Sequence, residues 1–311
     1  MQIIAKRKIA DTARILMVIS ITLLVYGIIL NISTIFGLVD KPTRGILSDQ
    51  DQNSSVISIT PSGDNEIVNS NGSNSRVSDA DLDKKNNMFR NEIEKEFSVA
   101  VRYGKETEGY KVGGVTTEPI TDSQVIYETL TSLYNTLSLY PPGIFKEIKD
   151  GGIPLMIILV NNYSEYSITG VTDSSYDYAN ISIAAVYDFS ESFYHESYHY
   201  LERYMFKKKA NFNSWDNLNP KDFQWNTIDG SLSYSNTFKE NAYFVNNYAQ
   251  TSAAEDRAST FEYMMAPSKA SCLNDGTPIW KKANYMALTI ETVFDTVSPD
   301  SIEYWERFIR S

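Results

Sequence analysis

The pattern of apolar and polar positions divides the chain into an N-terminal part that cannot form a core and a C-terminal part that can. An uninterrupted apolar run occupies 15–39, and the segment 40–87 is rich in Ser, Asn, Asp and Gly and contains no aromatic residue. Such a segment buries too little apolar surface to offset the entropy of ordering it. All four tryptophans and nearly all tyrosines and phenylalanines lie further on, so we predict one folded domain at 88–311.

Within this domain the hydrophobic periodicity predicts both helices and strands. Apolar residues recur at helical spacing, with suitable capping residues, in 84–97, 121–140, 190–206 and 252–265. Alternating or continuous apolar runs predict strands at 98–103, 154–160 and 181–187. The pattern indicates an α+β domain whose C-terminal half is mostly helical.

The apolar run at 15–39 predicts a transmembrane anchor. As a helix it would span about 37 Å, more than the hydrocarbon core of a bilayer, at about 30 Å. Four basic residues precede it against one acidic residue, so the positive-inside rule makes 1–14 a cytoplasmic tail and 40–87 a flexible extracytoplasmic tether. We expect a single-pass protein of the cell membrane, or a secreted one if the segment is instead a cleaved signal peptide.

Charge and cysteine content narrow the range of partners. The net charge of −11 argues against a nucleic-acid surface, which needs clustered Lys and Arg. The basic run Lys207-Lys208-Lys209 follows a predicted helix, and we interpret it as a solvated helix end. Cys272 is the only cysteine, so the chain forms no intramolecular disulfide.

The two histidines of the chain carry its most specific chemical signal. His195 and His199 enclose Glu196 in the pattern H-E-x-x-H, which presents two imidazoles to a zinc ion from one helix face. A catalytic zinc takes three protein ligands and keeps one position open for water. Because the sequence contains no third histidine, the third ligand must be a carboxylate.

The best candidate for the third ligand is Glu255. It lies three residues after Ser252, a suitable helix cap, so it could instead complete a capping box. Glu262 lies two turns further on the same helix face and is the second candidate. Asp256 either orients a ligating histidine or is an ordinary surface carboxylate. Glu202 shares the helix of the histidines, but an unbroken helix carries it past the metal.

A motif helix followed by a separate helix that bears a glutamate resembles the gluzincin clan of metallopeptidases. More narrowly, Tyr-Ala-x-Thr-x-x-x-Glu at 248–255 resembles the catalytic domain of anthrax lethal factor and related bacterial zinc metallopeptidases. The two segments 181–206 and 244–266 carry this resemblance. It implies a zincin-like domain with a small mixed sheet, one Zn²⁺ per chain bound by Glu255 as third ligand, and Tyr248 in contact with the reaction centre. It also implies that the strand before the motif helix forms the sheet edge that pairs with substrate.

Together these observations predict a membrane-anchored, extracytoplasmic, zinc-dependent endopeptidase. Glu196 is the expected general base, and Tyr248 is the expected donor to the developing oxyanion. The expected substrates are proteins or peptides associated with the surface or the envelope. The alternative is a non-catalytic, zincin-like binding or sensory ectodomain. Such a domain usually loses its base or a ligand, whereas Glu196 and both histidines are present here.

Overall fold

Strands and helices alternate in the first half of the folded domain, and helices dominate the second half. The computed structural model describes residues 79–112, 115–163, 169–174, 178–185, 189–226 and 243–310. Its helices are α2 (Asp79–Phe97), α3 (Ser123–Leu137), α4 (Ile144–Asp150), α5 (Ser190–Lys207), α6 (Ala253–Met265) and α7 (Pro278–Val293). Its strands are β1 (Ala100–Arg102), β2 (Lys111–Val112), β3 (Val115–Glu118), β4 (Leu155–Val160), β5 (Asn162–Tyr163), β6 (Gly170–Ser174) and β7 (Ala179–Ala184). The predicted α+β class is confirmed.

The main sheet is small and mixed, as predicted. Its strand order is β1-β4-β7-β6, in which β1, β4 and β7 run parallel and β6 is antiparallel to β7. Ile157 of β4 pairs with Ile181 of β7, and both side chains are fully buried, which suits the continuous apolar run of β4. A second, antiparallel sheet has the order β2-β3-β5.

One expectation about the sheet is wrong. The strand before the motif helix, β7, is an interior strand, and β6 forms the edge within the described residues. The sequence of β6, Gly-Val-Thr-Asp-Ser, contains no apolar run and only one large apolar side chain. Hydrophobic periodicity therefore missed this strand, although its backbone pairs with β7 over five residues.

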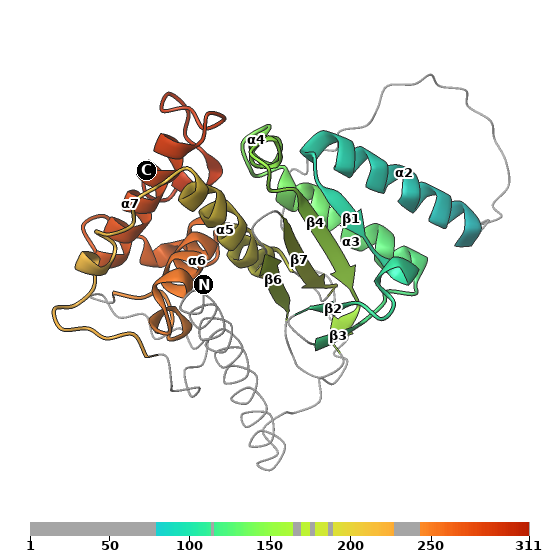
Figure 1. Ribbon diagram of the computed structural model, residues 1–311, viewed down its shortest axis with the longest axis horizontal. Helices are drawn as coiled ribbons and strands as arrows, with labels where there is room; N and C mark the ends of the chain where they lie inside the picture. The colour runs from blue at the N-terminus through green and yellow to red at the C-terminus, as the bar shows by residue number, and fades with distance from the viewer. Residues whose placement is uncertain are drawn as a thin grey trace, which may run out of the picture.

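Helices α2 and α5 lie on opposite sides of the main sheet (Figure 1). Helix α2 lies beside β1, with α3 packed against it, whereas α5 lies beside β6 and is followed by α6 and α7. Asp122 caps α3, because its carboxylate accepts hydrogen bonds from the backbone N–H groups of Gln124 and Val125. Helix α5 thus contacts both α6 and the edge strand β6.

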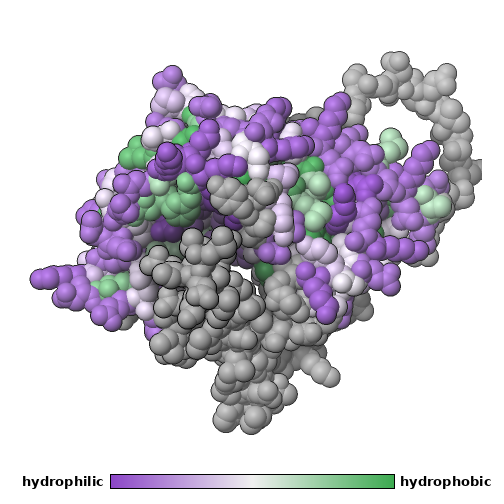
Figure 2. Space-filling view, viewed as in Figure 1, coloured by the Kyte–Doolittle hydropathy of each residue, from purple (hydrophilic) through white to green (hydrophobic). Residues whose placement is uncertain are grey.

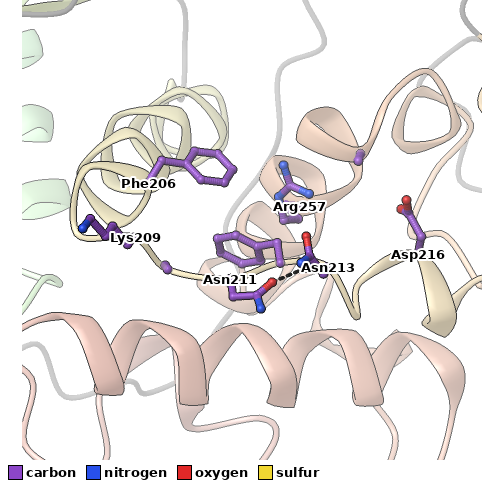
Figure 3. A pocket seen from close by; sticks show the side chains of 9 residues that line it. Phe206, Lys209, Asn211, Asn213, Asp216 and Arg257 are labelled. Atoms are coloured by element: carbon purple, nitrogen blue, oxygen red, sulfur yellow. Dashed lines mark hydrogen bonds between the residues drawn. The ribbon is translucent and has the colours of Figure 1, made fainter.

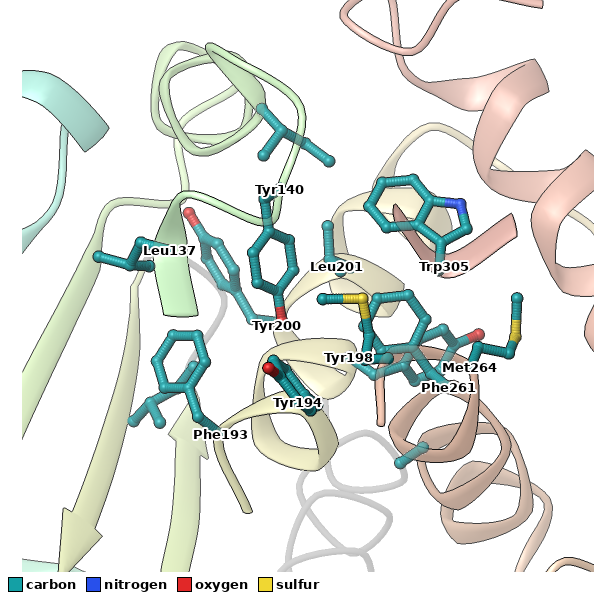
Figure 4. Packing of buried hydrophobic residues seen from close by; sticks show 14 of the residues in the cluster. Leu137, Tyr140, Phe193, Tyr194, Tyr198, Tyr200, Leu201, Phe261, Met264 and Trp305 are labelled. Atoms are coloured by element: carbon teal, nitrogen blue, oxygen red, sulfur yellow. The ribbon is translucent and has the colours of Figure 1, made fainter. Parts of the chain in front are cut away.

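A large aromatic core fixes the position of α5. Figure 4 shows Tyr198 of α5 beside Phe261 of α6, with a distance of 5.3 Å between ring centroids. The hydroxyl groups of Tyr140 and Ser197 share a hydrogen bond of 2.5 Å in the same buried region. Each fully buried aliphatic or aromatic side chain of this kind contributes about 1.5–3 kcal/mol. The opposite face of α5 is therefore held in a defined orientation.

The folded part begins earlier than the sequence indicated. Helix α2 starts at Asp79, so the last residues of the predicted tether 40–87 are helical. Asp79 and Asp81 lie in its first turn, where acidic side chains favour a helix N-terminus. The first turns of α2 are mostly exposed and contain no aromatic residue, so the aromatic content of the sequence does not indicate where the helix starts.

The predicted membrane localisation is corrected. None of the helices in the described ranges combines the length and the apolar character that a bilayer crossing requires. The two longest, α2 and α5, carry charged residues along their length. The predicted tail 1–14 and anchor 15–39 lie outside the described residues, and no membrane span is assigned. On the face shown in Figure 2 the described surface is mostly hydrophilic.

Candidate metal centre

Helix α5 presents both histidines on the face turned away from its aromatic core. His195 and His199 are four residues apart, so their side chains follow each other by about one helical turn, and their ring centroids are 5.1 Å apart. His195 is buried, and the side chain of His199 keeps 21% of its surface exposed. The pair therefore lies at the boundary between the core and solvent.

Helix α6 brings Glu255 to the two imidazoles. The hydroxyl group of Ser252 accepts a hydrogen bond of 3.1 Å from the backbone N–H of Glu255 and so caps the helix. The Oε2 atom of Glu255 lies 3.0 Å from Nε2 of His195 and 3.5 Å from Nε2 of His199. The cap thus uses the backbone of Glu255, while its carboxylate faces the histidines.

These three side chains fit a zinc ion. Their donor atoms all lie within 4.8 Å of one another. Two ligands bound tetrahedrally at about 2.0–2.2 Å lie about 3.3–3.6 Å apart, close to the observed 3.0 and 3.5 Å. Two imidazole nitrogens and one carboxylate oxygen are also the donor set of known catalytic zinc sites, which leave a fourth position for water.

The electrostatics of the cluster favour a bound cation. Burial lowers the pKa of His195, but the carboxylate of Glu255, which hydrogen-bonds its Nε2 atom, and the nearby carboxylates of Glu262 and Glu196 outweigh this effect and raise the pKa to about 10. The same balance, with Glu255 as the main partner, raises the pKa of His199. Burial raises the pKa of Glu255, but the two histidines lower it well below its ordinary range. The negative charge of the carboxylates thus favours a positive charge between the imidazoles, and a bound metal cation would supply it in place of the protons on the histidines.

Glu262, the second candidate ligand, lies at the other edge of the His195 ring. Its Oε2 atom is 3.4 Å from Nδ1 of His195, whereas Nε2 of the same ring faces Glu255. One imidazole cannot direct both nitrogens at one ion, so Glu262 is placed to orient His195. Its other oxygen is 2.5 Å from Nζ of Lys269, which is also 2.7 Å from Glu191. Metal-binding histidines commonly have such a carboxylate partner.

Asp256 does not orient a histidine, and it is not a surface carboxylate either. It is fully buried, accepts a hydrogen bond of 2.8 Å from the Trp215 indole, and lies 2.7 Å from Nζ of Lys282. Neighbouring residues on a helix point in different directions, so Asp256 faces away from the side on which Glu255 lies. Its role in the fold is to pair with Lys282, whose ammonium group is also fully buried.

Glu196 lies between the metal-binding face of α5 and the edge strand β6. A Cβ atom at Gly170 would lie 3.0 Å from Cγ of Glu196, so this glycine leaves room for the glutamate. The hydroxyl group of Thr172 donates a hydrogen bond of 3.0 Å to the backbone carbonyl of Glu196. Strand β6 therefore contacts the glutamate of the motif, whose charge acts on both His195 and His199.

Tyr248 lies beside the cluster as well. It begins a 3₁₀ turn, Tyr248–Gln250, that leads into the cap of α6. Its ring centroid is 5.9 Å from that of His195, and the side chain is only partly buried. The structure thus brings together His195, Glu196, His199, Tyr248 and Glu255. It places Glu262, the second candidate ligand, at the Nδ1 edge of His195, which no sequence pattern could identify.

A cavity of about 800 Å³ opens at the ligand cluster. Its lining includes His199 and Glu255 from the cluster, Thr172 from β6 and Arg203 from the next turn of α5. Glu202 also lines it, but this side chain forms an ion pair with Arg257 and is committed to structure. The cluster is therefore open to a molecule that approaches along the sheet edge.

Comparisons with known proteins leave the family open. No known protein family matches the chain, and no curated protein does either. The structure is similar to the crystal structure of a "putative zinc-binding metallo-peptidase" from Bacteroides caccae, with a TM-score of 0.47 and 12% sequence identity. The match covers 73% of this chain and 92% of that one. A similarity of this degree leaves the function to be inferred from the site.

Proposed function

We propose that the protein is a zinc-dependent endopeptidase. The observation that carries the proposal is the convergence of His195, His199 and Glu255, whose donor atoms lie within 4.8 Å of one another beside Glu196. A two-histidine, one-carboxylate site with an open position for water is typical of catalytic rather than structural zinc. These three residues would hold one ion per chain.

The residues around the ion have separate tasks. When bound, zinc acts as a Lewis acid that makes water nucleophilic near neutral pH. Glu196 accepts the proton of the attacking water and delivers it to the leaving amine, the role of a general base and then acid. Glu262 holds the ring of His195, since its carboxylate lies at the Nδ1 edge.

Tyr248 is the proposed donor to the oxyanion that develops on the scissile carbonyl. Its ring centroid is 5.9 Å from that of His195, and the residue is partly exposed. Losing a donor of this kind costs about 2.7–4 kcal/mol in the barrier where it has been measured. The resemblance to the catalytic domain of anthrax lethal factor supports this role and is itself still a prediction.

The edge strand supports peptide as the substrate class. Within the described residues β6 pairs only with β7, and its Thr172 lines the cavity at the ligand cluster. An extended peptide can add to such an edge through main-chain hydrogen bonds, which places its backbone beside Glu196. This arrangement admits the interior of a chain and so favours an endopeptidase.

The proposal is tested by chelation and reconstitution of the full-length protein. Purified protein would be analysed for metal content and incubated with a diverse peptide library, with cleavage followed by mass spectrometry. We expect about one zinc per chain, cleavage within peptides, loss of cleavage after chelation and recovery with added zinc. Bound zinc without any cleavage would instead support the non-catalytic binding domain, and failure to bind zinc would contradict the proposal altogether.

A further inference from the structure

The edge strand β6 is fixed by side-chain hydrogen bonds to the turn of α5 that carries the proposed base. The hydroxyl group of Thr172 donates a hydrogen bond of 3.0 Å to the backbone carbonyl of Glu196. One turn earlier on α5, the hydroxyl group of Ser192 donates a hydrogen bond of 2.8 Å to that of Thr169, just before β6. Because β6 also pairs with β7 over five residues, it cannot easily move away from α5.

The carboxylate of Glu196 has no polar partner of its own within the described residues. Its charge acts on both histidines, but no hydrogen bond or ion pair in this part of the chain holds its oxygens. The hydrogen bond from Thr172 reaches only the backbone of this residue. In the described structure, the position of the carboxylate is therefore set by the atoms against which the side chain packs.

Gly170 of β6 provides the space that this side chain occupies. A Cβ atom at Gly170 would lie 3.0 Å from Cγ of Glu196, 3.5 Å from its Oε1 atom, and 3.0 Å from Cδ1 of Ile183. Carbon atoms in good contact are about 3.5–4.0 Å apart, so a neighbour would have to move. Ile183 is fully buried in the interior strand β7, where close packing resists a shift, whereas Glu196 is only half-buried. Glu196 is therefore the side chain that would be displaced.

The opposite face of β6 offers a matched comparison. Successive side chains of a strand point to opposite faces, and Val171 packs against a separate apolar cluster. This cluster contains Ile158, Val160, Tyr163 and Ala184. One extra carbon atom at position 171 therefore alters the same strand without approaching Glu196.

A second cavity, of about 770 Å³, lies away from this contact. Figure 3 shows it with Phe206 and Lys209 from the end of α5, Arg257 of α6, and Asn211 and Asn213 on the connecting segment. Its lining includes no residue of β6 and none of the three proposed ligands. An exposed residue of this lining, such as Asn213, is therefore a distant control.

We propose that Gly170 is a positioning residue for the general base. This inference rests on the proposed peptidase function. The absence of a side chain at Gly170 lets Glu196 extend along β6 to the place from which it reaches the attacking water. The same strand offers its free edge to the peptide backbone. One element thus aligns the substrate and the base, and a misplacement of about 1 Å costs about 100-fold in rate.

The test measures kcat and KM of the full-length protein on a peptide that the wild type cleaves. We expect Gly170→Ala to lower kcat by about tenfold and Gly170→Val by about 100-fold, since the larger side chain displaces Glu196 further. KM and zinc content should stay at wild-type values, because the added atoms face α5 and touch no ligand. Val171→Ile and Asn213→Ala should keep the wild-type kcat.

Two double variants show whether the effect acts through Glu196. Ile183→Val removes the Cδ1 atom that crowds the new Cβ, so Gly170→Ala combined with Ile183→Val should recover most of kcat. In Glu196→Gln the base is already absent, so adding Gly170→Ala should not lower the residual rate further. The inference is overturned if Gly170→Ala lowers kcat equally with and without Glu196, or if it changes KM alone.

A structural readout separates this inference from the peptidase proposal. Crystal structures of zinc-loaded full-length wild type and Gly170→Val, or Gly170→Ala if the larger side chain prevents folding, should differ in the Glu196 side chain. We expect its carboxylate to move away from β6 while the three ligands stay in place. An unmoved carboxylate would refute the inference even if kcat falls. A displaced carboxylate in a protein that cleaves no peptide would support the positioning role of Gly170 and contradict the peptidase proposal alone.

Discussion

Glu255 and Asp256 are adjacent carboxylates on α6, but they have different partners. Glu255 faces α5 and contacts two imidazoles, with 23% of its side chain exposed to the cavity. Asp256 is completely buried against Lys282 and Trp215. A metal ion could replace the protons on the two histidines that face Glu255. Asp256 is instead paired with the ammonium group of Lys282.

The comparison shows how to distinguish a ligand from a structural carboxylate. Histidine is a good partner for a metal and a weak one for a carboxylate, because its charge depends on pH. Lysine cannot share a carboxylate with zinc at low cost, because the two cations repel each other. The partner of a buried acid therefore indicates its role better than its position in a motif does.

The largest expected effect is the loss of zinc from Glu255→Gln. Substitutions of residues that only orient a ligand typically cost about 10–100-fold in metal affinity, so removal of a ligand itself should cost more than about 100-fold. Peptide cleavage should disappear with the metal. Asp256→Asn is the neighbouring control, and any protein that remains folded should bind zinc as wild type does. Zinc titration with a competing chelator measures both variants.

The ion pair of Asp256 and Lys282, on the other side of α6, should affect the stability of the fold and not the affinity for zinc. Lys282→Met leaves Asp256 as an unpaired buried charge, which costs about 3–5 kcal/mol of folding free energy. The double variant Asp256→Leu with Lys282→Met removes both charges and should recover most of this loss. Urea denaturation of the zinc-free proteins checks the result, and a double variant no more stable than Lys282→Met would contradict it.

Glu262→Gln should have an intermediate effect on the metal. Its carboxylate lies at the Nδ1 edge of His195, so the neutral amide would weaken the orientation and the basicity of the ring. We expect zinc affinity to fall by about 10–100-fold, with the ion still bound at high zinc concentration. Glu291→Gln, which changes an acid paired with Arg310 elsewhere on the surface, is the control and should bind zinc normally.

The smallest change is a pH dependence that should differ between the zinc-free and the zinc-bound protein. The pKa of His195 is raised from 6.5 to about 10, so the cluster stabilises the zinc-free fold fully below pH 6.5 and loses this contribution as the pH rises towards 10. The pKa of Glu255 is lowered, so its contribution is present above about 4.5 and is lost as the pH falls.

Bound zinc should oppose the loss of stability at high pH, because ligation requires neutral imidazoles. The affinity for zinc should rise with pH by up to about tenfold per unit for each proton released. Thermal denaturation from pH 5.5 to 9 should therefore show a falling Tm without zinc and a growing difference in Tm when zinc is added. A difference that is independent of pH would mean that the histidines do not exchange protons for metal.

Several features could be predicted from the sequence because they depend on local spacing. His195 and His199 share a face of any helix that contains them, and Ser252 marks the start of α6 whatever lies beside it. The continuous apolar run of β4 also identifies a buried strand by itself. Helical periodicity thus sufficed for the two elements that carry the ligands.

The remaining features depend on how elements are rotated against one another, which spacing does not encode. Glu262 and Asp256 were both reasonable candidates, but only the packing of α6 between α5 and α7 sends one towards His195 and the other towards Lys282. Strand β6 was missed because pairing with β7, and not its own apolar pattern, makes it a strand.

The central claim is that the α5 and α6 cluster binds zinc and that Glu196 uses it to hydrolyse peptides. The most direct test measures zinc content and peptide cleavage in parallel for full-length wild type and Glu196→Gln. The account predicts equal zinc in both proteins, with cleavage lowered by at least about 100-fold in the variant, as expected when a general base is removed. Equal cleavage by the two zinc-loaded proteins would contradict it.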